Sequence, residues 1–203
     1  MPLDKPRPPE EVRNAFDDGL GRLPQRTRTR FMTQVESGAF AANLVADPLE
    51  IFVMTAADAA ADSGLVRATS RGWQYFVAQP PSEGSDPSRV AVVNVVRGQS
   101  GHQLTHIHRG WFPEATRRAI EAAERLPEAA GESFQLRVLA LPSLLTDALW
   151  LKNTGQGADV ILPIASADPA IKPREPYRSE DFLDAIRPLA ANKVASDDRP
   201  SGA

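Results

Sequence analysis

All three histidines of the 203-residue chain, His102, His106 and His108, fall within one stretch of seven residues. In an extended strand, alternate side chains point to the same face, so the three imidazoles would share one face, with Leu104 between them. Neutral imidazoles at this spacing can bind a divalent metal such as Zn²⁺. A metal that keeps an open position also activates water as a nucleophile. The pattern therefore predicts a metal site, and a metal-dependent hydrolase is one function that it supports.

Two features of the same stretch argue against a metal cage. Residues rise roughly 3.3 Å each along a strand, so His102 and His106 would stand about 13 Å apart. The chain has no further histidine to complete the ligand set, and Glu114 follows His108 only after six residues. Two alternatives stay open: histidines that hydrogen-bond with neighbours or solvent on a half-exposed strand, and a binding face that responds to pH.

Aromatic residues offer a second candidate site. Five aromatic residues lie on or near predicted strands, where large rings most often belong to the core: Trp73, Tyr75, Trp111, Phe112 and Trp150. They could instead line a hydrophobic concavity that takes a small apolar ligand or a segment of a protein partner, with Arg109 at its mouth. The sequence leaves both interpretations open.

Composition excludes several classes of site and partner. The chain has no cysteine, which excludes disulfides, thiol nucleophiles and cysteine-ligated metals. Its net charge is −3, its pI is about 5.7 and it shows no dense basic face, so we expect no nucleic-acid partner. No stretch reaches the roughly 18–20 apolar residues of a membrane span, so we expect no membrane partner.

The N-terminus has no apolar core of signal-peptide length, which favours a cytoplasmic protein. A bias towards alanine, arginine and proline is typical of a high-GC bacterial genome. We therefore expect a bacterial cytoplasmic protein.

Hydrophobic spacing predicts the elements that must position these residues. Helical spacing occurs over 9–23, 31–45 and 113–126, and a last helix starts at Ser179. Alternating or continuous apolar runs predict strands at 73–78, 90–96, 102–109, 134–141, 146–152 and 159–164. Residues 49–62 fit either one helix or a short strand followed by a helix. We prefer the second, because Thr55 and Asp58 stand at capping-box spacing.

Short turns between consecutive strands indicate antiparallel pairing. We therefore predict an α+β fold: a single antiparallel sheet of about five or six strands, with helices packed on one face and an N-terminal helical segment. One domain would span 9–191, with a helical part at 9–64 and a sheet-rich part at 70–191. Residues 1–8 are predicted to form a flexible tail and residues 192–203 a disordered tail.

No motif has the spacing of a nucleophile, a nucleotide-binding loop or a nucleic-acid interface, so no catalytic residue is assigned and we expect no enzymatic activity. This favours a non-catalytic binding or protein-interaction module that works with a protein partner or as a homo-oligomer and needs no cofactor. The alternatives are a metal-binding protein or metal-dependent hydrolase built on the histidines, and a carrier of a small apolar ligand.

Overall fold

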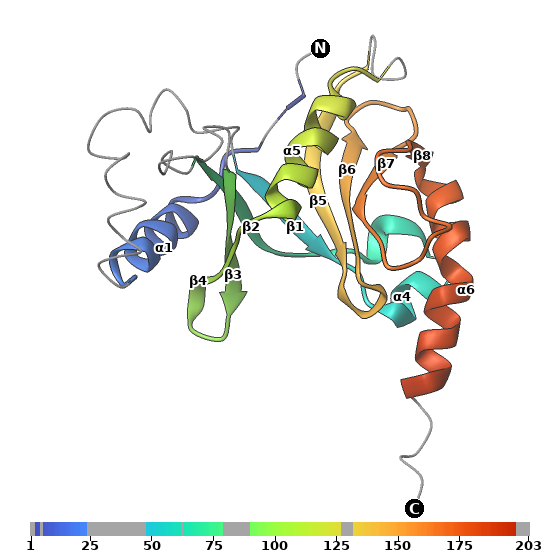
Figure 1. The fold of residues 1–203 in the computed structure, drawn as a ribbon, viewed down its shortest axis with the longest axis horizontal. Helices are drawn as coiled ribbons and strands as arrows, with labels where there is room; N and C mark the ends of the chain where they lie inside the picture. Colours follow the sequence, from blue (N-terminus) through green and yellow to red (C-terminus); the bar gives the residue numbers. More distant parts are fainter. Residues whose placement is uncertain are drawn as a thin grey trace, which may run out of the picture. The chain divides into compact units, whose positions relative to one another are not determined.

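The computed structural model describes residues 3–4, 6–23, 48–61, 63–78, 90–126 and 132–197. Within these ranges the chain forms eight strands and four α-helices, joined by two short 3-10 helices (Figure 1). The helix predicted over 31–45 lies outside the described residues. No helix in the described ranges is long and apolar enough to cross a membrane.

The strands are, in chain order, β1 (Leu49–Val53), β2 (Thr69–Ala78), β3 (Val90–Gly98), β4 (Gly101–His108), β5 (Phe134–Leu141), β6 (Thr146–Asn153), β7 (Val160–Ala165) and β8 (Tyr177–Arg178). They are hydrogen-bonded in the order β4-β3-β2-β1-β5-β6-β7-β8. The amide of Met54 donates to the carbonyl of Ala140, 3.1 Å away, so the carboxyl ends of β1 and β5 lie together, as in a parallel pair.

The α+β class and the N-terminal helix are thus confirmed, but the sheet is mixed and has eight strands, where about five or six antiparallel strands were predicted. Five of the strand pairs are antiparallel, as short connections require. The two-residue strand β8 is too short to show an alternating pattern in the sequence. Strands β1 and β5 are far apart in the sequence, so no local sequence pattern shows that they pair in parallel.

The chain divides into two compact units: unit 1 is Met1–Asp4, Ile51–Ser70 and Thr116–Ala203, and unit 2 is Lys5–Glu50 and Arg71–Ala115. Each unit is built from segments that are distant in sequence. The predicted parts at 9–64 and 70–191 follow sequence order, and the single-domain organisation stays a prediction.

Unit 2 contains helix α1 (Glu10–Gly21), most of β2, and the β3–β4 hairpin. Val12, Phe16 and Leu20 stand at helical spacing on α1 and are buried. They form one core with alternate residues of β2 and β3: Trp73, Tyr75, Val77, Ala91, Val93 and Val95. The alternation of the two strands therefore directs one whole face of this hairpin sheet to α1.

Unit 1 contains β5, β6, β7 and β8 with helices α4 (Ala56–Ala60) and α6 (Ser179–Asp197), and the 3-10 helices η1 (Gly64–Arg67) and η3 (Pro142–Leu144). One face of its sheet packs on α4 and α6. The shared core consists mainly of Leu139, Leu141, Ala148, Trp150, Ile161, Phe182, Leu183 and Ile186.

The opposite face of β6 is also buried, since Leu149 and Leu151 are fully covered. Helix α5 (Trp111–Ala123) has an apolar stripe of its own and buries Ala119 and Ala123 completely. Helices on one face only, as predicted, would leave such a strand half exposed. The continuous apolar run of β6 is typical of a strand covered on both faces.

The local prediction for residues 49–62 is confirmed. Residues Leu49–Val53 form β1, and Thr55 caps α4 by accepting a hydrogen bond from the amide of Asp58 at 3.1 Å. The hydroxyl of Thr55 in turn donates to the carboxylate of Asp58 at 2.6 Å. The β-branched residues of the strand and the cap at Thr55 therefore favour a strand followed by a helix over one long helix.

Both predicted tails contain ordered residues. Asp4 forms a parallel bridge with Gln135: its amide donates to Phe134 at 2.8 Å, and its carbonyl accepts from Leu136 at 2.9 Å. At the other end α6 continues to Asp197, past the boundary predicted at residue 191, although Pro188 lies inside it. A proline removes one helical hydrogen bond but does not always end a helix.

Candidate functional site

A β-bulge in β4 decides where the three histidines lie. Leu104 pairs with Val95 and His106 pairs with the next residue, Asn94, so Thr105 has no partner of its own on β3. The hydroxyl of Thr105 donates to the carbonyl of Asn94 at 3.3 Å, across the irregularity. One extra residue inverts the alternation of side chains beyond it. The three histidines therefore do not share one face, as an unbroken strand predicts.

His102 lies on the face of β4 that is turned to α1. Its Nδ1 is 3.3 Å from Oε1 of Glu11, on that helix. On the same face, Leu104 and Ile107 pack against the core of unit 2, on either side of the bulge. Leu104 and Ile107 are three residues apart and would point to opposite faces of a regular strand. Both reach this core because Thr105 is the extra residue of the bulge.

His106 and His108 lie on the opposite face, in a row of four rings. The two imidazoles are stacked, with centroids 5.9 Å apart and planes at 19°. Phe112 lies 5.4 Å from the His108 ring, and Trp111 contacts Phe112 edge-on at 5.8 Å. We call His106, His108, Trp111 and Phe112 the histidine–aromatic surface.

Trp111 lies at the start of a helix that was predicted to begin at residue 113. The chain leaves β4 at His108, Gly110 takes a left-handed φ of 86°, and α5 starts at Trp111. The ring is 68% exposed, and an edge-on contact joins it to the histidine side through Phe112. Sequence reasoning named Phe112 among the aromatic candidates, but its contact with His108 depends on this reversal.

A buried amide pair lies behind His108. The amide nitrogen of Gln74 donates to Oδ1 of Asn94 at 3.4 Å, and Nδ2 of Asn94 lies 3.4 Å from Nε2 of His108. Gln74 is only 2% exposed, and no described residue forms a hydrogen bond with its Oε1. Sequence reasoning missed both residues. The signal was Asn94 itself, a polar residue inside the apolar run of β3, which needs a polar partner.

Burial lowers the pKa of His108 from its ordinary value of 6.5, and the neighbouring His106 lowers it further. Both effects disfavour a second positive charge at this place. His108 is therefore mostly neutral at pH 7, which leaves a ring nitrogen free to accept a proton, a hydrogen bond or a metal.

The remaining aromatic candidates lie elsewhere. Trp73 and Tyr75 are buried in the core of unit 2, where Tyr75 stacks on Phe16 with centroids 4.1 Å apart. Trp150 is buried in the core of unit 1. Arg109 is exposed directly after β4. Of the predicted ligand-binding residues, only Arg109, Trp111 and Phe112 therefore belong to the segment that follows the histidines. The rings of Trp73, Tyr75 and Trp150 pack in the cores.

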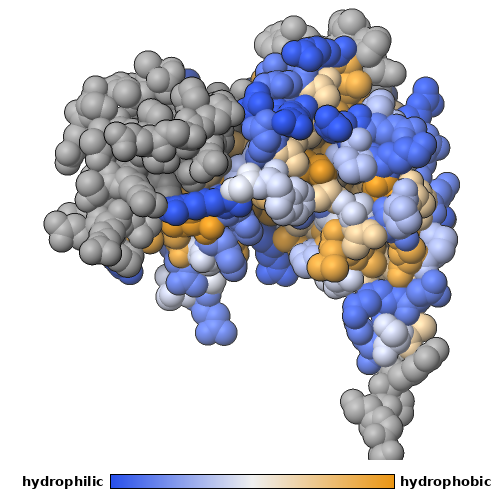
Figure 2. Space-filling model, viewed as in Figure 1, coloured by the Kyte–Doolittle hydropathy of each residue, from blue (hydrophilic) through white to orange (hydrophobic). Residues whose placement is uncertain are grey.

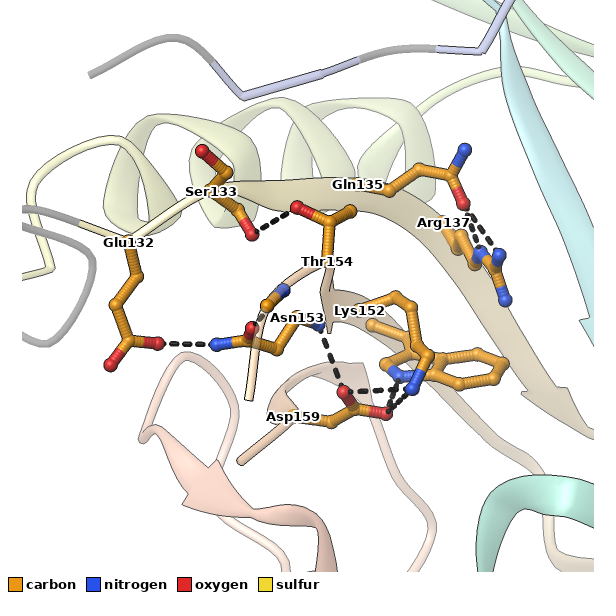
Figure 3. Close-up of polar contacts among 10 residues, drawn as sticks. Glu132, Ser133, Gln135, Arg137, Lys152, Asn153, Thr154 and Asp159 are labelled. Atoms are coloured by element: carbon orange, nitrogen blue, oxygen red, sulfur yellow. Dashed lines mark hydrogen bonds and ion pairs between the residues drawn. The ribbon is translucent and has the colours of Figure 1, made fainter. Parts of the chain in front are cut away.

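A polar network in unit 1 surrounds Asp159 (Figure 3). Its carboxylate accepts hydrogen bonds from the indole of Trp150 and the backbone amide of Asn153, both at 2.9 Å, and from Lys152 at 3.3 Å. The side chain of Asn153 continues the network by donating to Glu132. Every one of these contacts joins the ends of β6 and β7 or the start of β5, so we assign the network a structural role.

Beside this network, the guanidinium of Arg137 lies over two rings, 4.5 Å from the centroid of Phe52 and 4.8 Å from that of Trp150. Its Nε donates to Oε1 of Gln135 at 2.8 Å (Figure 3). Cation–π contacts of this kind hold the guanidinium in place over the faces of the two rings.

Unit 1 also carries apolar surface. Figure 2 shows hydrophobic residues gathered where η3 joins β5 to β6, and Leu145, which follows η3, is 72% exposed. Two residues further on, burial raises the pKa of Asp147 from 3.8 to about 6. No cation or hydrogen-bond donor accompanies its carboxylate in the described part of the chain, so this group destabilises the fold when it ionises.

No group of three histidine, aspartate or glutamate side chains is placed to hold a metal among the residues that the structure describes. No protein-family model matches the chain, and searches of curated proteins and of solved structures return no match.

Proposed function

We propose that the protein is a non-catalytic binding module, and that a segment of a partner protein docks on the histidine–aromatic surface. One observation carries the proposal: Trp111 is 68% exposed, and its ring is held against Phe112 rather than turned into a core. Tryptophan is enriched among the residues that dominate binding energy at interfaces, because a rigid ring buries much area at little entropic cost.

The strand beside this surface supports the same proposal. β4 is the first strand in the hydrogen-bonded order, so β3 is its only neighbour among the described strands. All eight of its residues are partly or fully exposed. An edge strand offers backbone donors and acceptors to an added strand, while side chains on its faces supply specificity. An extended peptide paired with β4 would carry its own side chains past His106 and His108.

The same edge is available on a second copy of the chain, so a homo-oligomer is one outcome of the test. A carrier of small apolar ligands has less support, because Trp73, Tyr75 and Trp150 pack inside cores. The bacterial and cytoplasmic setting of the module rests on sequence alone and stays part of the proposal.

The test is a selection of random peptides on the purified chain, with binding measured by fluorescence anisotropy. We expect selected peptides to lose at least tenfold in affinity for the Trp111→Ala variant, because the largest exposed ring of the surface is gone. Leu145→Ala is the matched control, since it removes a similarly exposed apolar side chain from unit 1. It should leave binding unchanged.

The proposal fails if no peptide is enriched and sedimentation shows a monomer, or if the selected peptides bind the Trp111→Ala variant as well as the parent chain. A concentration-dependent dimer that dissociates in the Trp111→Ala variant would identify a second copy as the partner.

A further inference from the structure

The bulge leaves two histidines on one face, and their separation is close to what a shared metal ion requires. The ring centroids of His106 and His108 are 5.9 Å apart. Metal–nitrogen bonds are about 2.0–2.1 Å long and a ring nitrogen lies roughly 1 Å from its centroid, so two imidazoles on one tetrahedral ion stand roughly 5 Å apart. The two rings must therefore approach each other by about 1 Å. Because their planes are nearly parallel, at 19°, one ring must also rotate so that a nitrogen of each points at the same ion.

One of the two rings is free to make this movement. His106 is exposed, whereas His108 is half-buried beside Phe112. Rotation of an imidazole about its second side-chain torsion is soft, since such torsions have broad minima. The better-held ring thus provides a fixed ligand, and the exposed ring closes on the ion.

Asn94 is placed to orient the fixed ligand. Nδ2 of Asn94 lies 3.4 Å from Nε2 of His108 and can only donate to it, because an amide nitrogen does not accept hydrogen bonds. Reversing the side-chain amide of Asn94 places its oxygen there instead. When Nε2 carries the proton, the amide oxygen of Asn94 accepts it and Nδ1 is left for a metal. Histidine ligands commonly donate their second ring N–H to an oxygen in this way. Gln74 can reverse its amide together with Asn94, which preserves their hydrogen bond.

We propose that His106 and His108 chelate one divalent transition-metal ion of the Zn²⁺, Ni²⁺ and Cu²⁺ class on the edge strand β4, and that His102 takes no part. Two imidazoles leave at least two coordination positions open to water or to a donor atom of a bound partner. The ligand chemistry selects these ions over Mg²⁺ and Ca²⁺, which prefer oxygen ligands. The inference uses the same surface as the proposed function but does not depend on it.

The experiment is a titration of the full chain, stripped of metal and desalted, with Zn²⁺ and then Ni²⁺ in a calorimeter. We expect one ion per chain and no binding of Mg²⁺. His106→Ala and His108→Ala should each lower the affinity for Zn²⁺ at least tenfold, because one of two protein ligands is lost. His102→Ala is the matched control, because the bulge puts this histidine on the α1 face, and its affinity should stay within twofold of the parent chain.

Three results would overturn the inference. One is the absence of Zn²⁺ binding to the parent chain up to millimolar concentration. Another is unchanged binding in the chain that carries both His106→Ala and His108→Ala. The third is an equal loss in His102→Ala, which would mean that all three histidines act together. Trp111→Ala separates this inference from the proposed function, because it should lower the affinity for selected peptides at least tenfold and leave the metal titration unchanged.

Discussion

Asp147 should make the stability of unit 1 fall as the pH rises. Its side chain sits on the middle strand β6, opposite Ala140 of β5 and Ala165 of β7. Burial raises its pKa from 3.8 to about 6. The folded chain therefore binds this proton more tightly than the unfolded chain, and between pH 4 and 6 it binds more protons. Under this condition the free energy of unfolding decreases as the pH increases.

The magnitude follows from the two pKa values. About 6 minus 3.8 is about 2 pKa units, and each unit corresponds to about 1.4 kcal/mol, so full ionisation costs roughly 3 kcal/mol. The variant Asp147→Asn keeps the shape of the side chain and removes the charge. We expect its free energy of unfolding to match the parent chain near pH 4 and to exceed it by up to roughly 3 kcal/mol at pH 7.

The assay is urea denaturation at several pH values between 4 and 8. Fluorescence of Trp150 reports on unit 1 alone in a background with Trp73→Phe and Trp111→Phe, since both of those residues belong to unit 2. Asp184→Asn is the control, because Asp184 is an exposed carboxylate paired with Arg187 on α6. A difference between Asp147→Asn and its parent that does not change with pH would refute the reasoning.

Two further predictions concern buried polar groups, and both are measured by denaturation. Asp159→Ala leaves the indole N–H of Trp150 and the amide of Asn153 without their acceptor. The free energy of unfolding of unit 1 should therefore fall by about 2–5 kcal/mol. A decrease below about 0.5 kcal/mol would contradict the structural role of the network. Tyr75→Phe removes a buried hydroxyl that has no hydrogen-bond partner among the described residues, so the free energy of unfolding should stay equal or rise by about 1 kcal/mol. The control, Tyr177→Phe, removes an oxygen that accepts a hydrogen bond and should lower the free energy of unfolding.

Local signals in the sequence were sufficient for most elements. The capping pair Thr55 and Asp58 separates β1 from α4 as predicted. Alternating or continuous apolar runs located β5, β6 and β7 within one or two residues. These features depend on residues that are close in the chain. The parallel direction of β1 and β5 and the short strand β8 depend on distant pairing, and no local pattern encodes them.

The candidate site was predicted in its residues but not in its geometry. The three histidines are conspicuous by type and spacing, yet whether they converge depends on the bulge at Thr105, which arises from pairing with β3. Similarly, Gly110 marks a turn, but only the start of α5 at Trp111 brings Phe112 against His108.

Because of the bulge at Thr105, β4 could be one residue shorter without any change in the direction of its other side chains. If Thr105 were deleted, Leu104 and Ile107 would still point to the core and His106 would still point away from α1. The reason is that Thr105, as the extra residue of the bulge, takes no part in the alternation of side chains. Deletion would straighten the strand and leave both of its faces unchanged. Inserting one residue between His106 and Ile107 would instead turn Ile107 out of the core. This strand thus tolerates the deletion of one residue without turning its buried side chains to the other face, which a regular strand does not.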